Sequence, residues 1–137
     1  MRVMAVDYGD ARTGIAVSDD SASLVGEALV ISEKDLEAVA GVISAQATSR
    51  GVDVIVVGFP KNMNGTIGPR AIMSEQFAEY LRSKCGAEVV LWDERMTTIS
   101  AHRILDDTGR YGKKRKKTID AVAAALILES YLAYLKK

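Results

Sequence analysis

A run of six residues in the middle of the chain, 52–57, is almost entirely β-branched (VDVIVV). Such a continuous apolar run is typical of a strand buried on both faces, because a strand with one face in water alternates apolar and polar residues. A strand of this kind needs layers of other structure on both sides of its sheet. The run therefore favours an α/β fold in which helices cover a sheet.

The segments on either side of this run fit such a fold. Apolar and β-branched residues predict four further strands, at residues 2–6, 13–18, 25–31 and 88–92. Start and stop signals predict helices that begin at Ser32, Pro69, Met96 and Thr118 and end near Gly51, Lys84, Asp107 and Leu135. Strands joined through helices pair in parallel, whereas the first two strands, joined by a short turn, form an antiparallel hairpin. We expect a mixed five-stranded sheet with helices on both faces.

Composition limits the class of protein further. The chain of 137 residues has room for one domain, 1–137, and its 48% hydrophobic and 26% charged residues are ordinary for a globular protein. Cys85 is the only cysteine, which excludes an internal disulfide and fits a reducing compartment. The apolar start of the chain is interrupted at Asp7, unlike a signal peptide, and no apolar stretch is long enough to span a bilayer. We therefore expect a cytoplasmic protein.

One strongly basic segment, RYGKKRKK at residues 110–117, stands out from a net charge of zero. A charge run of this kind is commonly a solvated loop, here one that leads into the last helix. It is also what a phosphate-contacting segment looks like. The run by itself does not separate these two interpretations.

Acidic residues occur where several predicted elements meet. Asp7 follows the first strand, Asp93 and Glu94 follow the last, and Asp120 starts a largely apolar helix. Each has a local alternative: Asp7 can accept turn amides, Asp93 or Glu94 can pair with Arg95, and Asp120 can favour a helix start. Carboxylates gathered at one edge of a sheet would repel unless a cation lay among them, and Mg²⁺ prefers oxygen ligands. Two such ions can stabilise the attacking and leaving oxygens of a phosphodiester displacement.

Several other kinds of site are absent from the sequence. There is no GxxxxGK[ST] loop, no GxGxxG dinucleotide motif and no set of cysteines and histidines for zinc. His102 is the only histidine, so a Ser-His-Asp triad has little support.

Four stretches, MAVDYGDARTGIAVSD, VVGFPKNMNGTIGPRA, LWDERMTT and KRKKTIDAVAAALILESYL, together cover most of the chain. In this order and spacing they resemble the YqgF family, also called RuvX or Holliday-junction-resolvase-like. The departure that we notice is Phe59, where the family commonly has Leu. The resemblance implies an RNase H-like fold, a divalent-metal nuclease site and an assigned role in maturing the 5′ end of pre-16S ribosomal RNA.

The resemblance also implies roles for individual residues. The family acids fall on Asp7, Glu94 and Asp120, which would hold two Mg²⁺ or Mn²⁺ ions. Phosphate contacts would come from Lys61, Asn62, Arg95, Lys113, Lys114 and Arg115. The partner would be nucleic acid, with RNA favoured over DNA, in the setting of pre-ribosomal particles. Because neighbouring residues of a strand point to opposite faces, only one of Asp93 and Glu94 readily reaches the metals, and the motif favours Glu94.

Three other functions remain as alternatives: a DNA junction resolvase, a nucleic-acid-binding module of the same fold with little or no catalysis, and an ATPase of the actin and sugar-kinase type. The ATPase needs two such domains to enclose a nucleotide, and this chain has room for one. A metal-dependent cleavage assay separates a nuclease from a binding module. The sequence does not fix the oligomeric state.

The basic run gives a first prediction. If Lys113 to Lys117 contact backbone phosphates, changing several of them to Gln should weaken binding to all nucleic acid sequences alike. It should also flatten the dependence of the affinity on salt, because fewer counterions are released. A salt titration of binding checks this. An unchanged slope of affinity against salt concentration would show that the run is solvated and does not contact phosphate.

Overall fold

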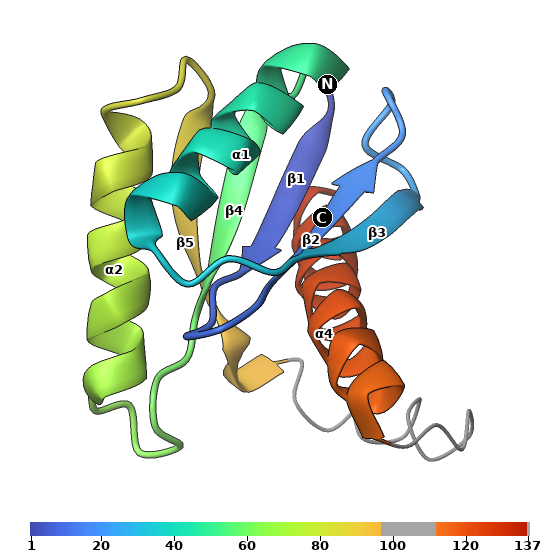
Figure 1. Cartoon of the computed structure of the whole chain (residues 1–137). Coiled ribbons are helices and arrows are strands. Elements are labelled where there is room, and N and C mark those ends of the chain that lie inside the picture. The colour runs from blue at the N-terminus through green and yellow to red at the C-terminus, as the bar shows by residue number, and fades with distance from the viewer. Residues whose placement is uncertain (97–111, 137) are drawn as a thin grey trace.

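The computed structural model describes residues 1–96 and 112–136. Within them lie five strands, two helices between strands, a short 3₁₀ turn and a long C-terminal helix (Figure 1). Their bounds are β1 Val3–Asp7, β2 Thr13–Ser18, β3 Val25–Ile31, α1 Leu36–Arg50, β4 Val54–Phe59, α2 Pro69–Arg82, β5 Glu88–Asp93, η1 Glu94–Met96 and α4 Gly112–Leu135. The expected order of strands and helices is confirmed in these ranges.

The five strands form one mixed sheet in the order β3-β2-β1-β4-β5. β1 pairs antiparallel with β2 and parallel with β4, and β4 pairs parallel with β5. β1 and β4 are thus the central strands of the parallel half. The registers align Val6 with Val57 and Gly58 with Trp92, so the carboxyl ends of β1, β4 and β5 meet at one edge of the sheet.

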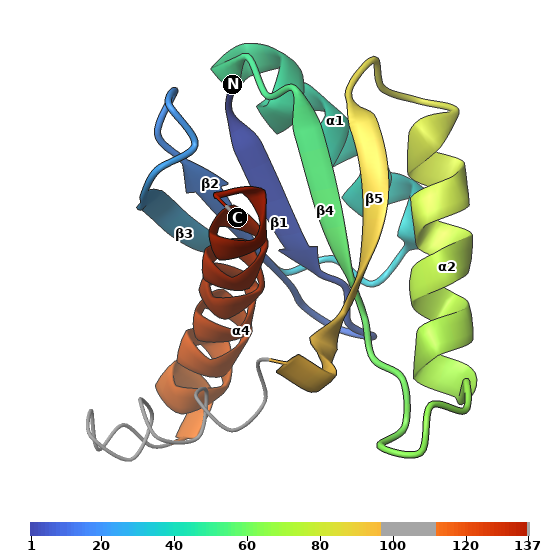
Figure 2. The ribbon, with the colours of Figure 1, turned by 180° about the vertical axis from the view of Figure 1, so that it is seen from behind.

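Helices cover both faces of this sheet. One core lies under α1 and α2 and contains Met4 and Val6 of β1. The other lies under α4 and contains Val3 and Ala5 of the same strand (Figure 2). The alternation along β1 shows why the central strands are apolar throughout: both faces of the sheet are removed from water.

β4, at Val54–Phe59, lies two residues later than the strand expected at 52–57, and two helix starts also differ from the sequence expectation. α1 begins at Leu36 rather than after Ser32, because the side chain of Asp35 accepts a hydrogen bond from the amide of Ala38 at 3.1 Å and acts as the N-cap. α4 begins at Gly112 rather than Thr118, so residues Lys113 to Lys117 of the basic run lie on a helix and not in a loop. Their side chains, and all of residues 97–111, lie outside the described part of the structure; most of the helix expected at 96–107 falls there.

No helix in the described ranges combines the length and the apolar character needed to cross a membrane.

Candidate active site

Two of the predicted acids lie at the shared carboxyl edge of β1, β4 and β5. Asp7 is the last residue of β1, where it pairs with Gly14 of β2. Glu94 is the first residue of η1, directly after β5. Between their strands runs β4, which ends at Phe59. The structure therefore places the two acids two strands apart at the same end of the sheet.

Alternation along the strands puts both acids on the face that α4 covers. Val3 and Ala5 of β1 belong to the core under α4, so Asp7 follows on the same face. On β5, Val90 and Trp92 pack against that core, and Glu94, two residues after Trp92, lies on the same side. Asp93, the residue between them, points to the opposite face of the sheet.

Gly58 of β4 lies between the two acids and makes room for Glu94. A Cβ atom at Gly58 would lie 2.9 Å from both Cδ and Oε2 of Glu94 and 2.7 Å from Cδ1 of Ile127 on α4. The carboxyl group of Glu94 is therefore folded back over the backbone of β4, in the direction of β1. Any side chain at position 58 would occupy the space that this carboxyl group fills.

The environment of Glu94 disfavours its charged form. The pKa of Glu94 is raised from an ordinary 4.5 to about 7. Burial is the largest cause, the negative charges of Asp7 and, more weakly, Asp93 add to it, and the positive charge of Arg70 opposes it. Asp7 and Glu94 are thus close enough to repel one another. A divalent cation between such carboxylates would relieve the repulsion.

Asp93 has a local partner. Its carboxylate accepts hydrogen bonds from Nη2 of Arg95 at 2.6 Å, from Nε at 2.9 Å and from the backbone amide of Arg95 at 3.0 Å. The side-chain hydrogen bond from Arg95 is the main reason that the pKa of Asp93 is lowered. The local role expected for one of the two neighbouring acids is therefore filled by Asp93.

The third predicted acid is placed only by its backbone. Asp120 lies on α4, four residues before the buried Ala124 and seven before Ile127, positions that share one face of a helix. Its side chain is not among those described, and neither are those of Lys113, Lys114 and Arg115, which lie in the first turns of α4. Among the side chains that are described, no three acids, cysteines or histidines gather to hold a metal.

The remaining predicted contact residues follow β4 and β5. Asn62 donates through Nδ2 to Oγ1 of Thr66 at 2.9 Å and so helps to fold its own loop. Nζ of Lys61 lies 5.6 Å from the ring centre of Phe59, and its charge acts on Asp93. Arg95 is held by Asp93. Their phosphate contacts stay predictions.

Sequence reasoning missed Gly58 and Arg70. The β-branched run predicts a strand that ends at Val57, yet Gly58 lies within β4 and is where the Glu94 carboxyl group packs. Its position at the end of the most apolar predicted strand was the available signal. No sequence pattern predicts that Arg70, at the start of α2, interacts with Glu94, because the two residues are far apart in the sequence and only the fold brings them close.

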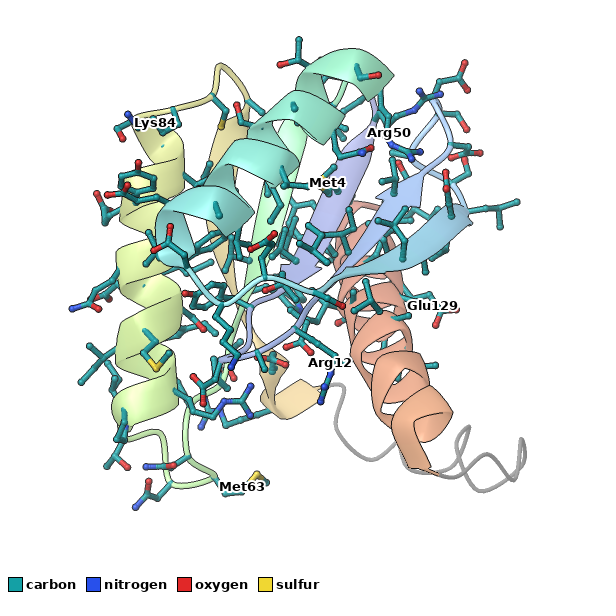
Figure 3. The ribbon with its side chains drawn as sticks, viewed as in Figure 1. Met4, Arg12, Arg50, Met63, Lys84 and Glu129 are labelled. Carbon is teal, nitrogen blue, oxygen red and sulfur yellow. The ribbon has the colours of Figure 1, made fainter. Side chains whose placement is uncertain are left out.

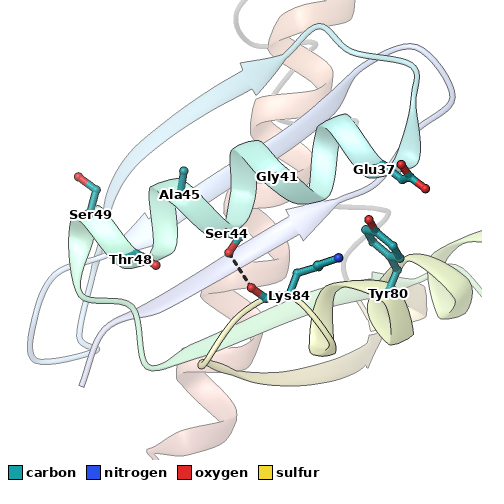
Figure 4. Close-up of a pocket in the computed structure, with 8 residues that line it drawn as sticks. All are labelled: Glu37, Gly41, Ser44, Ala45, Thr48, Ser49, Tyr80 and Lys84. Atoms are coloured by element: carbon teal, nitrogen blue, oxygen red, sulfur yellow. Dashed lines mark hydrogen bonds between the residues drawn. The ribbon is translucent and has the colours of Figure 1, made fainter.

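The hollow between α1 and α2, about 720 Å³ in volume, is a different feature (Figure 4). It is lined by residues of α1 together with Tyr80 and Lys84, and Oγ of Ser44 donates to the carbonyl oxygen of Lys84 at 3.2 Å. Its lining holds one carboxylate, Glu37. It lacks the paired acids that a two-metal site needs.

Solved structures with the same architecture define the class. The fowlpox virus resolvase, solved with its substrate Holliday junction DNA, superposes with a TM-score of 0.66 at 13% identity, over all of both chains. Thermus thermophilus RuvC, in complex with a Holliday junction substrate, gives a TM-score of 0.64 at 11% identity, over 100% of this chain and 97% of its own. At these identities the likeness concerns the fold. The chain has the RNase H-like fold of these resolvases.

Sequence comparison identifies the family. The RuvX family model, described as a Holliday junction resolvase, matches residues 1–134. Relatives from Halothermothrix orenii and Geobacillus thermodenitrificans are 42% and 46% identical, over 100% and 96% of this chain and 98% and 97% of their own. Each carries a name that assigns it as a pre-16S rRNA nuclease. The chain belongs to the RuvX family.

The raised pKa of Glu94 predicts a stability change with pH in metal-free protein. Below the ordinary pKa of 4.5 the carboxyl group is protonated in both the folded and the unfolded state, and stability is lost as the pH rises through about 7. Glu94→Gln removes this loss, so at pH 8 the variant should be more stable than the wild type by about 3 kcal/mol. Urea unfolding in EDTA from pH 4 to pH 8 measures the difference.

The matched control for this measurement is Glu129→Gln, at an exposed position on α4. Its stability should follow that of the wild type at every pH. Parallel curves for Glu94→Gln and the wild type would contradict the proposed environment of Glu94.

Gly58→Ala tests the packing of Glu94. The new Cβ would lie under 3 Å from the Glu94 carboxyl group and Ile127. We expect a loss of roughly 1–3 kcal/mol in the free energy of unfolding, together with a loss of nuclease activity as Glu94 is displaced. Gly86→Ala is the control, because a Cβ there meets nothing within 4 Å. Equal activity and melting temperature in the two variants would show that Gly58 does not position Glu94.

Proposed function

We propose that this chain is a metal-dependent endonuclease that processes the 5′ end of pre-16S ribosomal RNA. Membership of the RuvX family classes it as a hydrolase that cleaves phosphodiester bonds. The proposal adds the metal, the RNA substrate and the residues that act. The observation that carries it is the Glu94 carboxyl group lying over Gly58, close enough to Asp7 for the two charges to interact.

The donors present fit a hard divalent ion. Asp7 and Glu94 offer carboxylate oxygens on one face of the sheet, and their repulsion makes the pair a better site for a cation than either acid alone. We place Asp120 as the third ligand, on the helix that covers this face. When bound, two Mg²⁺ or Mn²⁺ ions would supply Lewis-acid stabilisation of the attacking and leaving oxygens of the phosphodiester.

The chain's own residues have distinct tasks in this proposal. Glu94 must be ionised to act as a ligand, and its raised pKa means that ion binding competes with a proton near neutral pH. Asp93 keeps Arg95 beside the site, where the guanidinium can contact a phosphate. Lys61, Asn62 and the basic residues Lys113, Lys114 and Arg115 of α4 would contact the backbone farther along the strand.

The proposed substrate is RNA rather than a DNA junction. Support for RNA comes from the names of whole-length relatives at more than 40% identity, whereas the resolvases that bind junctions share 11–13% identity and the fold. The family description is the specific observation that keeps junction DNA as the second candidate. A ribosomal RNA substrate places the protein in the cytoplasm, with pre-ribosomal particles as its partners.

Cleavage assays on three variants test the site. With Mg²⁺ or Mn²⁺, Asp7→Asn and Glu94→Gln should each lower the cleavage rate by at least roughly 100-fold, since each removes a ligand charge. Asp93→Asn is the matched control: it removes the adjacent acid, and should cost stability and only part of the rate. EDTA should abolish cleavage by the wild type. The rates are compared on a pre-16S 5′-leader RNA and a four-way DNA junction.

Three results would contradict parts of this proposal. Full activity in Asp7→Asn would remove the catalytic assignment. A swap in behaviour between Asp93→Asn and Glu94→Gln would move the ligand by one residue. Faster cleavage of the junction than of the RNA would favour the resolvase function, and binding without cleavage of either would favour a binding module.

A further inference from the structure

The loop between β4 and α2, residues 60–68, presents apolar side chains to solvent. Met63 is 81% exposed, the highest value among the large hydrophobic residues of the described ranges, and Ile67 is 51% exposed. We call these two residues the apolar tip. Exposed apolar side chains that gather in one place commonly mark an interaction site, whereas single ones are ordinary.

Hydrogen bonds within the loop fix the backbone on both sides of Met63. The amide of Asn62 donates to the carbonyl oxygen of Thr66 at 2.9 Å, and the amide of Gly65 donates to that of Asn62 at 2.8 Å. Oγ1 of Thr66 donates to Oδ1 of Asn64 at 2.7 Å, and Gly65 has a φ of +86°, which favours glycine. The loop is closed on itself by these bonds, and its fold leaves Met63 outside.

The apolar tip lies at the same edge of the sheet as the acids. The loop starts directly after the last residue of β4, and Gly65 approaches Arg95: a Cβ at Gly65 would lie 3.5 Å from Nη1 of that residue, which follows Glu94 in the chain. Figure 3 shows Met63 projecting from this end of the molecule, away from the helices and the sheet. Lys61 of the loop and Arg70 of α2 act electrostatically on Asp93 and Glu94.

The combination of apolar tip and neighbouring cations matches the chemistry of a nucleic acid strand. Phosphates pair with lysine and arginine, and the flat faces of unstacked bases pack against apolar side chains. Met is long, unbranched and polarisable, so it adapts to any base and contacts aromatic rings favourably. A protein partner could also bind the apolar residues, but cations placed beside an acidic pair would add less to its affinity than to that of a phosphate backbone.

We infer that Met63, supported by Ile67, contacts the face of an unstacked base next to the cleaved phosphodiester. The inference rests on the proposed function and narrows its substrate to strands with an unpaired or readily unstacked base at the site. Lys61 contacts the backbone and holds the strand, while the apolar tip distinguishes an open strand from a continuous duplex. Met63 is thus a specificity-determining residue and takes no part in the chemistry.

The test measures binding in an Asp7→Asn background, so that the RNA stays intact. Two fluorescent RNAs are compared, a hairpin with an unpaired loop and a fully paired duplex of equal length. Met63→Ser should weaken binding to the looped RNA by about 5-fold or more, the lower end of base-stacking contributions, and leave the duplex affinity unchanged. Met63→Leu, which keeps an apolar side chain of similar size, should bind the looped RNA almost as tightly as the parent does. A melting curve of each variant confirms that it is folded.

Two matched variants separate this role from general effects. Leu24→Ser changes another exposed apolar residue, 69% exposed between β2 and β3, and should bind both RNAs as the parent does. Lys61→Gln should weaken both RNAs and flatten the salt dependence, whereas Met63→Ser should keep the parent slope, because an apolar contact releases no counterions.

Equal affinities of Met63→Ser and its parent for the looped RNA would overturn the inference, and so would an equal loss on looped and paired RNA. A partner that is a protein would give the first of these results. Cleavage by the chain with Asp7 intact is measured separately. If that protein cleaves RNA and Met63→Ser binds normally, the inference fails alone; if it cleaves nothing, the proposed function fails, whatever the binding shows.

Discussion

The parallel pairing of β1, β4 and β5 is the constraint on which the rest of the molecule depends. Because β1 and β4 are buried on both faces, one core forms under α1 and α2 and another under α4, and neither strand can slip by one residue without moving its side chains to the wrong core. The fixed register brings three carboxyl ends to one edge. The packing that stabilises the fold thus also sets the spacing of the acids.

The candidate site works against this stability. Glu94 is largely removed from water beside another acid, and its charged form is disfavoured in the metal-free protein. Its carboxyl group lies over Gly58, and Ile127 of α4 approaches the same point of β4. Repulsion of this kind would favour the binding of a cation, because the ion would replace it with attraction to both carboxylates.

Neighbouring residues of the chain divide the work at this edge. Asp93 and Glu94 are adjacent, yet one holds Arg95 in solvent and the other enters the space under α4. The loop after β4 similarly uses Asn62, Asn64 and Thr66 to close on itself, and turns Met63 outward. Residues that hold the loop and residues that face solvent therefore alternate along a short stretch of sequence.

The sequence by itself determined the strands, the layers and the positions of the acids at the strand ends, since β-branched runs, helix periodicity and turn residues are local signals. It could not choose between Asp93 and Glu94 without a family resemblance, and it misplaced the starts of α1 and α4. Only the tertiary structure decided that Glu94 packs against Gly58, that Arg70 acts to lower the pKa of Glu94, and that Met63 stays exposed. Each of these depends on side chains from separate strands and helices meeting in space, and no local pattern along the chain records such meetings.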